Sequence, residues 1–446
     1  MALSSPGSVT AVPLPPVESD AETRARLRTV TAASLLGTTV EWYDFFLYAT
    51  AASLVFNKLF FPDQSSLVGT LLSFATFAVG FVMRPIGGLV FGHIGDRIGR
   101  KRTLALTMVL MGLATTLMGV LPTAAAVGVA APILLLVLRM IQGFALGGEW
   151  AGAVLLAVEH SPARKRGLFG SIPQVGLALG LALGTAVFAL LQVVLDDKAF
   201  LDYGWRIAFG ISLILVVVGL VVRLKVDETP AFRELDRLSR KASAPIKDVV
   251  IPPNTRNTVL GLLSRWGEGA AFNTWGVFAI SYATGSLGLH RVPVLVGVSI
   301  AAVVMALLLP VSGILTDRLG ARRIYTIGIA AYGVLVFPVF ALFGTKNLIW
   351  FTIAMVAVFG VVHALFYGAQ GTLYASLYPT EIRYTGLSVV YQMSGIYASG
   401  LTPLILTSLI AAGGGTPWIA CAYLVGTAVI SVIATSLIRR SDVHFE

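Results

Sequence analysis

The sequence predicts an all-α integral membrane protein with twelve transmembrane helices, arranged as two pseudo-symmetric six-helix bundles. Three observations support this fold class: the composition, a succession of long apolar stretches, and two motifs that recur about half a chain apart. Of the 446 residues, 56% are hydrophobic or aromatic and only 12% are charged. Soluble domains carry roughly 25% charged residues, about twice that share. The mean hydropathy of +0.84 is typical of a chain whose surface faces lipid.

This composition disfavours a soluble enzyme, a disordered regulator and a secreted disulfide-rich domain. The single cysteine, Cys421, cannot form an internal disulfide or a multi-thiolate metal site. The five histidines show no metal-ligand spacing. No motif combines a nucleophile, a base and an oxyanion site. We therefore expect a protein that is not an enzyme and that holds neither a metal nor another cofactor.

Apolar stretches long enough to cross a membrane recur along the whole chain. Crossing about 30 Å of hydrocarbon takes roughly 20 residues of helix. The predicted spans lie near residues 30–56, 66–92, 103–121, 131–158, 168–195, 206–224, 257–284, 292–316, 324–343, 347–376, 385–411 and 417–438. Some of these runs contain polar residues, but turn or charge signals bound each of them.

The distribution of basic residues predicts the orientation of the chain. If both termini are cytosolic, the connections on the inner side hold 24 of the 32 Lys and Arg residues, and those on the outer side hold five. Such an imbalance is the signature of the positive-inside rule. The basic residues form short clusters between apolar runs and no stripe with interleaved aromatic residues. A nucleic-acid partner is therefore not expected.

The chain divides into five predicted regions. Residues 1–29 form a cytosolic tail, 30–225 a first six-helix bundle, 226–256 a charged and proline-containing cytosolic linker, 257–438 a second bundle, and 439–446 a short cytosolic tail.

Two motifs indicate that the bundles arose by duplication. The motif over residues 92–102 (GHIGDRIGRKR) closes the second span, and a similar one over 313–323 (GILTDRLGARR) closes the eighth, 221 residues later. A second motif follows the fourth and the tenth spans, and its glycines, Gly167 and Gly386, are 219 residues apart. Parallel repeats with a binding site near the membrane midplane are a known transporter architecture.

The repeated loop has the chemistry of a cytosolic gate. Its glycines allow a tight turn, its aspartate suits a helix N-terminus, and its arginines can pair with acidic partners. The residues expected to form this gate are Gly92, Asp96, Arg97, Gly99, Arg100, Asp317 and Arg318. The alternative is a basic loop that only sets the topology.

This loop resembles the signature of the major facilitator superfamily, and the resemblance covers nearly the whole chain. Within that superfamily, four segments resemble the metabolite:proton symporter family: residues 41–48 (EWYDFFLY), 83–88 (MRPIGG), 139–150 (RMIQGFALGGEW) and 379–388 (PTEIRYTGLS). Residues 52–62 (ASLVFNKLFFP) are most similar to its shikimate transporter branch. One departure is Ala321, where the second loop lacks the usual arginine.

The resemblance implies a secondary transporter of the bacterial cell membrane that imports a small organic acid with protons by alternating access. The implied partners are a small carboxylate, protons and the lipid bilayer, and the chain is expected to work as a monomer. One alternative substrate is a zwitterionic osmolyte of the betaine or proline type. Another alternative is drug efflux in exchange for protons, which three arginines within the spans disfavour. A sensor that binds a solute without carrying it is also disfavoured.

Charged residues inside the predicted spans are the candidates for proton coupling. Glu41 and Asp44 are three residues apart and share one face of the first helix. Asp44 and Arg139 lie about 18 and 12 Å from the outer ends of their spans, at comparable depths. A pair between them is therefore geometrically reasonable, and a carboxylate that loses its arginine takes up a proton more readily. The resemblance implies that this acid of the first helix, Asp44, is the proton carrier. The alternative is a purely structural ion pair.

The remaining polar and aromatic residues within the spans are expected to line the substrate site. Arg84 and Glu149 form a second candidate pair, either a gate or a structural contact. The expected substrate-binding residues are Tyr43, Tyr48, Arg84, Gln142, Glu149, Trp150, Arg265, Glu268, Asn273, Trp275, His363, Gln370, Tyr374, Tyr391 and Gln392. For Trp275 and Tyr374, packing is an equally good interpretation, and for His363 an interior hydrogen-bonded histidine is the better one.

Overall fold

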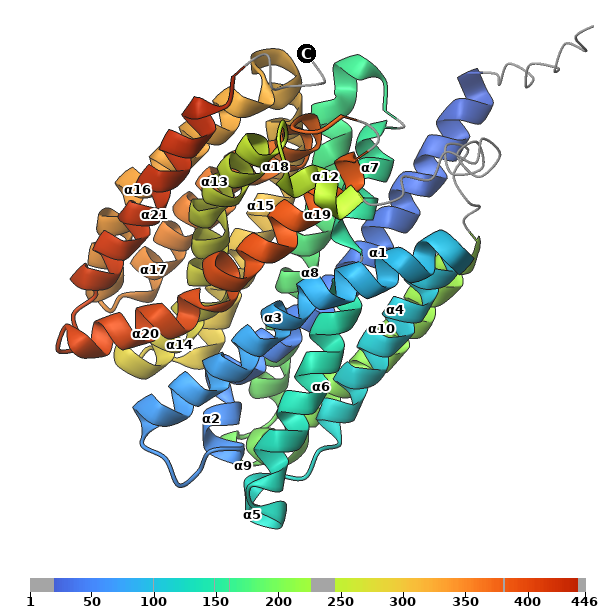
Figure 1. Cartoon of the computed structure of the whole chain (residues 1–446). Helices are drawn as coiled ribbons and strands as arrows, with labels where there is room; N and C mark the ends of the chain where they lie inside the picture. The colour runs from blue at the N-terminus through green and yellow to red at the C-terminus, as the bar shows by residue number, and fades with distance from the viewer. Residues whose placement is uncertain are drawn as a thin grey trace, which may run out of the picture.

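The computed structural model describes residues 20–98, 100–147, 149–159, 161–225, 245–379 and 382–439. Within these ranges every regular element is a helix. The helical segments run back and forth between the two ends of the molecule (Figure 1). The end of the molecule at which α21 (Trp418–Leu437) finishes is called the end that carries the C-terminus, and it also carries the start of α1 and the short helix α12.

The described residues before the central gap, 20–225, are called the first half. Its elements are α1 (Asp20–Leu54), α2 (Phe56–Leu59), α3 (Ser66–Ile98), α4 (Arg100–Gly119), α5 (Ala124–Val127), α6 (Ala130–Leu146), α7 (Trp150–Glu159), η1 (Ala163–Lys165), α8 (Arg166–Val194), α9 (Asp197–Ala199), η2 (Phe200–Gly204) and α10 (Trp205–Lys225).

The described residues after the gap, 245–439, are called the second half. Its elements are α12 (Pro245–Val250), α13 (Thr255–Asn273), η3 (Thr274–Phe278), α14 (Ala279–Ser281), η4 (Tyr282–Ser286), α15 (Arg291–Leu319), α16 (Ala321–Gly344), α17 (Leu348–Met355), η5 (Val356–Val362), α18 (His363–Ser376), α19 (Arg383–Ser394), η6 (Gly395–Gly400), α20 (Thr402–Ala412) and α21 (Trp418–Leu437).

Within the described ranges, nine helical stretches are long and apolar enough to cross a membrane. They coincide with nine of the twelve predicted spans. The other three predicted spans correspond to α1, α4 and the segment from α13 to η4. The apolar part of α4, Ala105–Gly119, is short, and α13 carries polar and charged side chains that lower its hydropathy.

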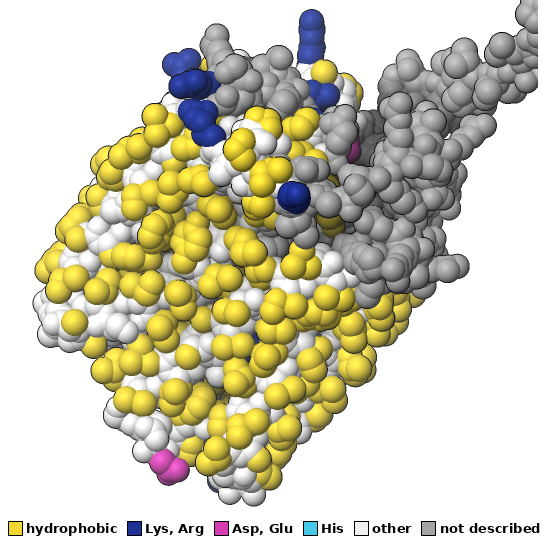
Figure 2. Space-filling model, viewed as in Figure 1, with side chains coloured by type: hydrophobic (Ala, Val, Ile, Leu, Met, Phe, Trp, Pro, Cys, Tyr) yellow, Lys and Arg dark blue, Asp and Glu magenta, His cyan; other side chains and the backbone are white. Residues whose placement is uncertain are grey.

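The outer surface has the composition expected of a lipid-facing protein. Many large apolar side chains are exposed, among them Val129, Leu307 and Val334. Figure 2 shows hydrophobic side chains covering the body of the molecule, while most of the visible lysine and arginine side chains gather at the end that carries the C-terminus. A soluble protein rarely exposes apolar patches of this extent. This apolar surface therefore faces the lipid bilayer.

Local sequence signals explain several helix ends and irregularities. Gly320 ends α15 and begins α16 with a φ of 88°, a left-handed conformation that favours glycine. The side chain of Asn347 accepts hydrogen bonds from the main-chain N–H groups at the start of α17. Short π-helical segments, η3, η5 and η6, interrupt three of the second-half crossings. Such segments occur often at functional sites.

Helices α3 and α6 approach so closely that their contact requires glycine. A Cβ atom added at Gly143 would lie 2.1 Å from the main-chain oxygen of Gly80. We therefore expect Gly143→Ala to lower the stability of the folded protein by about 2 kcal/mol, because two backbones would have to move apart. Thermal unfolding in detergent checks this expectation. Gly210→Ala is the matched control, because its Cβ would meet nothing within 4 Å; equal melting temperatures for both variants would contradict the packing argument.

Candidate functional site

A cavity lies between the two halves, near the middle of the long helices. This central cavity is lined by Trp42, Phe45, Phe81, Arg84, Leu177, Arg265, Glu268, Phe272, Asn273, Tyr367, Tyr391 and Ser399. Its walls come from α1, α3 and α8 in the first half and from α13, α18, α19 and η6 in the second. Both halves therefore contribute to one cavity, as expected of a midplane site between two parallel repeats.

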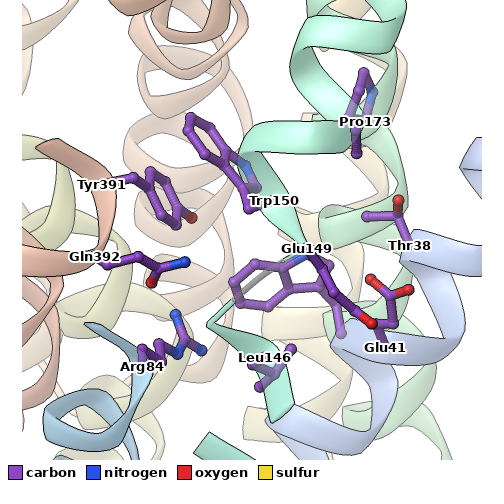
Figure 3. Close-up of a pocket in the computed structure, with 11 residues that line it drawn as sticks. Thr38, Glu41, Arg84, Leu146, Glu149, Trp150, Pro173, Tyr391 and Gln392 are labelled. Atoms are coloured by element: carbon purple, nitrogen blue, oxygen red, sulfur yellow. The ribbon is translucent and has the colours of Figure 1, made fainter. Parts of the chain in front are cut away.

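A second cavity adjoins the first toward the end that carries the C-terminus. This adjoining cavity is lined by Thr38, Glu41, Trp42, Arg84, Leu146, Glu149, Trp150, Ala153, Pro173, Tyr391 and Gln392 (Figure 3). Three of these residues, Trp42, Arg84 and Tyr391, also line the central cavity. They mark the junction between the two spaces.

Arg84 is the cation at this junction. It lies on α3 and is 3% exposed. Its guanidinium lies over the rings of Phe45 and Phe81, with Cζ at 4.5 and 4.2 Å from the ring centroids. Among the described residues, Nε and Nη2 have no hydrogen-bond acceptor, and no carboxylate lies within ion-pair distance. A buried cation without a counter-ion is costly, so this group favours an anionic ligand.

Arg265 lies in the same cavity but already has partners. Its Nε is 3.3 Å from Oε2 of Glu268, one turn along α13. Its Nη1 donates a hydrogen bond of 3.0 Å to Oγ of Ser394. Both members of the ion pair are buried. Arg265 therefore offers a ligand less uncompensated charge than Arg84 does.

Asp44 lies away from both cavities, inside the first half. Its carboxylate is fully buried, and Oδ1 accepts a hydrogen bond from the hydroxyl of Ser212 on α10. Within the described part of the chain, Oδ2 has no hydrogen-bond partner. The Nε2 of Gln142 donates to the main-chain carbonyl of Asp44 at 3.3 Å and to Oγ1 of Thr115 at 2.8 Å. This side chain thus has an open oxygen within a polar cluster.

The structure shows no direct ion pair between Asp44 and Arg139, although both side chains are described. Arg139 instead donates from Nη1 to Oε1 of Gln142, which lies one turn along the same helix. Its guanidinium also lies over the rings of Phe45 and Tyr48, with Cζ at 4.5 and 4.2 Å from their centroids. Gln142 therefore connects the predicted partners, which still belong to one buried cluster. Their role in proton coupling stays a prediction.

Glu41 and Glu149 both line the adjoining cavity and are almost completely buried. Glu149 accepts a hydrogen bond from the hydroxyl of Thr107 on α4. Figure 3 shows these two carboxylates on one side of the cavity, with Arg84 and Gln392 on the other. Arg84 and Glu149, the second predicted pair, thus share a cavity.

Seven of the predicted substrate-binding residues line neither cavity. Tyr43 and Tyr48 donate hydrogen bonds inside the first half, to the carbonyl of Ala208 and the hydroxyl of Thr76, and Gln142 belongs to the Asp44 cluster. The other four are completely buried in the second half: Trp275, His363, Gln370 and Tyr374. Aromatic rings surround Trp275 and His363, and the Tyr374 hydroxyl is hydrogen-bonded to that of Tyr325. For Trp275 and Tyr374, packing is thus the interpretation that these contacts favour.

The structure also adds lining residues that the sequence analysis did not single out. They are mostly aromatic: Trp42, Phe45, Phe81, Phe272 and Tyr367. In an apolar helix, an aromatic residue that faces a cavity has the same neighbours in sequence as one that faces lipid. Only the position of Trp42 and Phe45 beside Glu41 and Asp44 gave a usable signal.

Contacts between the halves lie at the end of the molecule that carries the C-terminus. Asp317, at the end of α15, accepts hydrogen bonds from the main-chain N–H groups of Gly167 (2.6 Å) and Leu168 (3.0 Å) at the start of α8. Arg383 forms an ion pair with Glu159 at 3.1 Å. These contacts join residues of the repeated motifs to the opposite half. They lie at the end where the repeated motif predicts a gate.

The rest of the predicted gate is only partly described. Arg318 is exposed beside Asp317. The first-half members of the gate lie outside the residues whose side chains the structure describes: Gly92, Asp96, Arg97, Gly99 and Arg100.

We expect Asp317→Ala to weaken the closure of this end. The change removes a negative charge and two acceptors from a helix N-terminus, a loss of about 1 kcal/mol or roughly a fivefold shift toward the open form. The labelling rate of a cysteine at Ala153, measured from the side of the C-terminus, checks it. Asp63→Ala, an exposed loop change, is the control; unchanged labelling in Asp317→Ala would count against a gating role.

Comparison with known proteins agrees with this architecture. The sequence model of the Major Facilitator Superfamily matches residues 34–403 and 298–443. The chain belongs to this superfamily. It is 38% identical over 421 residues to the inner membrane metabolite transport protein YhjE of Escherichia coli, covering 93% of this chain and 95% of that protein. It is 37% identical over 422 residues to the shikimate transporter of E. coli, covering 94% and 96%.

Other members of the superfamily extend the comparison. The proline/betaine transporter of E. coli is 34% identical over 419 residues, covering 92% of this chain and 82% of that protein. A solved proton:xylose symporter, bound to 6-bromo-6-deoxy-D-glucose, superimposes with a TM-score of 0.75 over 93% of this chain and 95% of that chain, at 18% sequence identity. As a member of this superfamily, the protein is a multi-pass membrane transporter and not an enzyme. Its fold is the predicted twelve-helix architecture.

Proposed function

We propose that this transporter imports a small organic acid together with protons across the bacterial inner membrane. The observation that carries the proposal is the Arg84 guanidinium, buried at the junction of the cavities without a carboxylate partner among the described residues. A ligand carboxylate can accept two parallel hydrogen bonds from a guanidinium. In this proposal the two predicted bundles, residues 30–225 and 257–438, rock about the cavity, with both termini in the cytosol.

The rest of the central cavity suits the body of such an acid. Phe45, Phe81 and Phe272 offer apolar and aromatic walls. Asn273, Tyr367 and Ser399 offer neutral hydrogen-bonding groups for hydroxyl or carbonyl substituents. Aromatic walls combined with convergent polar groups are typical of a small-molecule site. These features favour a hydroxylated or ring-containing acid such as shikimate, which also fits the name of one relative.

The buried carboxylates support coupling to protons. Asp44 has an open carboxylate oxygen and belongs to a cluster with Gln142 and Arg139. Phe45 connects this cluster to the cavity, because its ring contacts the guanidinium groups of both Arg139 and Arg84. Occupancy of Arg84 can thus affect the electrostatic environment of Arg139 and Asp44. Coupling of this kind requires only that substrate and proton favour the same conformation.

One feature favours a second candidate, a zwitterionic osmolyte. The adjoining cavity places Glu41 and Glu149 near the aromatic rings of Trp42, Trp150 and Tyr391. Carboxylates and aromatic rings together bind ammonium groups well. The carboxylate of a betaine- or proline-type substrate could pair with Arg84, while its ammonium group would extend into this cavity. The name of one relative also points to this class.

Uptake into proteoliposomes tests the proposal. Purified protein would be given a panel of radiolabelled solutes. The panel comprises two groups: shikimate and other organic acids, and the zwitterions glycine betaine and proline. An imposed inward proton gradient is the driving force. We expect accumulation of an organic acid that a protonophore abolishes.

The outcomes separate the candidates. Gradient-driven accumulation of glycine betaine or proline, but of no acid, would transfer the assignment to the zwitterionic class. Downhill uptake that is insensitive to the proton gradient would overturn the coupling part of the proposal. Extrusion of cationic drugs in exchange for protons would overturn both parts.

A further inference from the structure

Tyr391 separates the two cavities. Its ring lies against the indole of Trp150, with centroids 3.5 Å apart and ring planes inclined by 13°. Trp150 belongs to the first half and Tyr391 to the second. The two rings face one another in Figure 3, between Gln392 and Pro173. This stacked pair is therefore a contact between the halves at the boundary of the central and adjoining cavities.

The other face of the Tyr391 ring is occupied by Arg265. The Cζ atom of Arg265 lies 3.8 Å from the ring centroid. Glu268 and Ser394 hold this guanidinium by the ion pair of 3.3 Å and the hydrogen bond of 3.0 Å. Tyr391 is thus held between an indole from one half and a fixed cation from its own half. Such an arrangement restricts the tyrosine to one orientation.

The backbone around the stack is also joined across the halves. Trp150 is the first residue of α7, directly after the interruption that follows α6 at Leu146. Its indole N–H donates to Oε1 of Gln174 at 3.4 Å. Beside it, Nε2 of Gln392 donates to the main-chain carbonyl of Gly147 at 2.8 Å. The helix break thus exposes a carbonyl that the second half uses as an acceptor.

We propose that the Trp150–Tyr391 stack is an inner gate between the two cavities, and that Arg265 is the positioning residue that holds this gate closed. A solute leaving the central cavity toward the end that carries the C-terminus must pass this boundary. Opening requires the rings to part, which also breaks the Gln392 contact. The gate is distinct from the closure at the helix ends, because Asp317, Arg383 and Glu159 line neither cavity.

Cysteine accessibility tests the gate without any transported solute. In a Cys421→Ala background, Ser399→Cys reports on the central cavity and Ala153→Cys on the adjoining one. Membrane vesicles with the C-terminal side outward would be treated with a charged, membrane-impermeant thiol reagent. Tyr391→Ala and Trp150→Ala are expected to speed the labelling of Ser399→Cys by about tenfold, because each removes the aromatic contact. Labelling of Ala153→Cys should change little.

Matched variants separate gating from general disruption. Tyr391→Phe retains the ring and should label at the parental rate. Arg265→Gln should speed the labelling, whereas Arg265→Lys, which keeps the cation, should restore slow labelling. Trp418→Ala removes another stacked ring, on Phe337 at the exposed surface, and should leave the rate unchanged.

Equal labelling of Ser399→Cys in the parent, Tyr391→Ala and Trp150→Ala would overturn the gate. Fast labelling in Arg265→Lys would overturn the positioning role of Arg265. Thermal unfolding of each variant identifies proteins that label quickly only because they are misfolded. For those, Tyr391→Leu, which keeps a larger apolar side chain than alanine and removes the ring, replaces the alanine variant and must label quickly if the gate is real. Because no solute is used, these results are independent of whether the proposed substrate class is correct.

Discussion

Arg84→Gln is expected to weaken substrate binding by roughly a hundredfold. The change removes a guanidinium that has no carboxylate partner among the described residues and faces both cavities. Charge-assisted hydrogen bonds to a buried carboxylate contribute about 2–3 kcal/mol, and about 2.7 kcal/mol corresponds to a factor of a hundred. The half-saturating concentration in the uptake assay measures this loss. Arg84→Lys keeps the charge but not the paired donors, so its half-saturating concentration should lie between those of the parent protein and Arg84→Gln.

Two comparisons make the Arg84 experiment specific. Arg206 also lies over an aromatic ring, that of Trp205, but it donates to main-chain carbonyls and lines neither cavity. Arg206→Gln should therefore leave the half-saturating concentration unchanged. Arg265→Gln should have a smaller effect than Arg84→Gln, because Glu268 already neutralises Arg265. A larger effect at Arg265 than at Arg84 would contradict the assignment of the carboxylate site.

Asp44→Asn is expected to abolish accumulation driven by the proton gradient while leaving exchange of substrate across the membrane. The amide keeps the shape of the side chain and its contact with Ser212 but cannot bind and release a proton. Each pH unit of gradient is worth about 1.4 kcal/mol per proton, or about tenfold in the solute concentration ratio. The ratio of substrate concentration inside to outside the proteoliposomes should therefore fall from the gradient-driven value of the parent protein to about one.

The control for Asp44 is Asp63→Asn, an exposed carboxylate in the connection between α2 and α3. It should accumulate substrate like the parent protein. Full accumulation by Asp44→Asn would show that the proton is carried elsewhere. Loss of both accumulation and exchange would indicate a structural role for Asp44, as in the ion-pair alternative of the sequence analysis.

The fold could be predicted because its determinants are local in the sequence. Lipid imposes long apolar runs, and the repeated motifs mark the duplication directly. Gly320 and Asp317 illustrate this: the first takes the left-handed turn that the motif spacing required, and the second caps a helix N-terminus. The burial of Arg84 beside a cavity could be predicted for a related reason, since a charge within an apolar span seldom faces lipid.

The composition of the cavity wall could be predicted less well. Phe81, Phe272 and Tyr367 are aromatic residues in apolar helices, and sequence alone does not tell which of their faces meets the opposite half. The place of Gln142 between Asp44 and Arg139 was missed although a signal existed. A glutamine three residues after an arginine on one helix can accept its hydrogen bond. This local hydrogen bond competes with the pairing that comparable depth in the membrane alone would allow.

The separation of Asp44 from the cavity surface has an evolutionary consequence. Gln142 contacts both Arg139 and the main chain of Asp44 inside the first half, while the residues that line the central cavity lie on the other side of Phe45. If this cluster carries the proton as proposed, substitutions on the cavity wall can alter selectivity without changing the residues that couple transport to protons. Relatives that share a third of this sequence but carry the names of different solutes are what such a division of labour would produce.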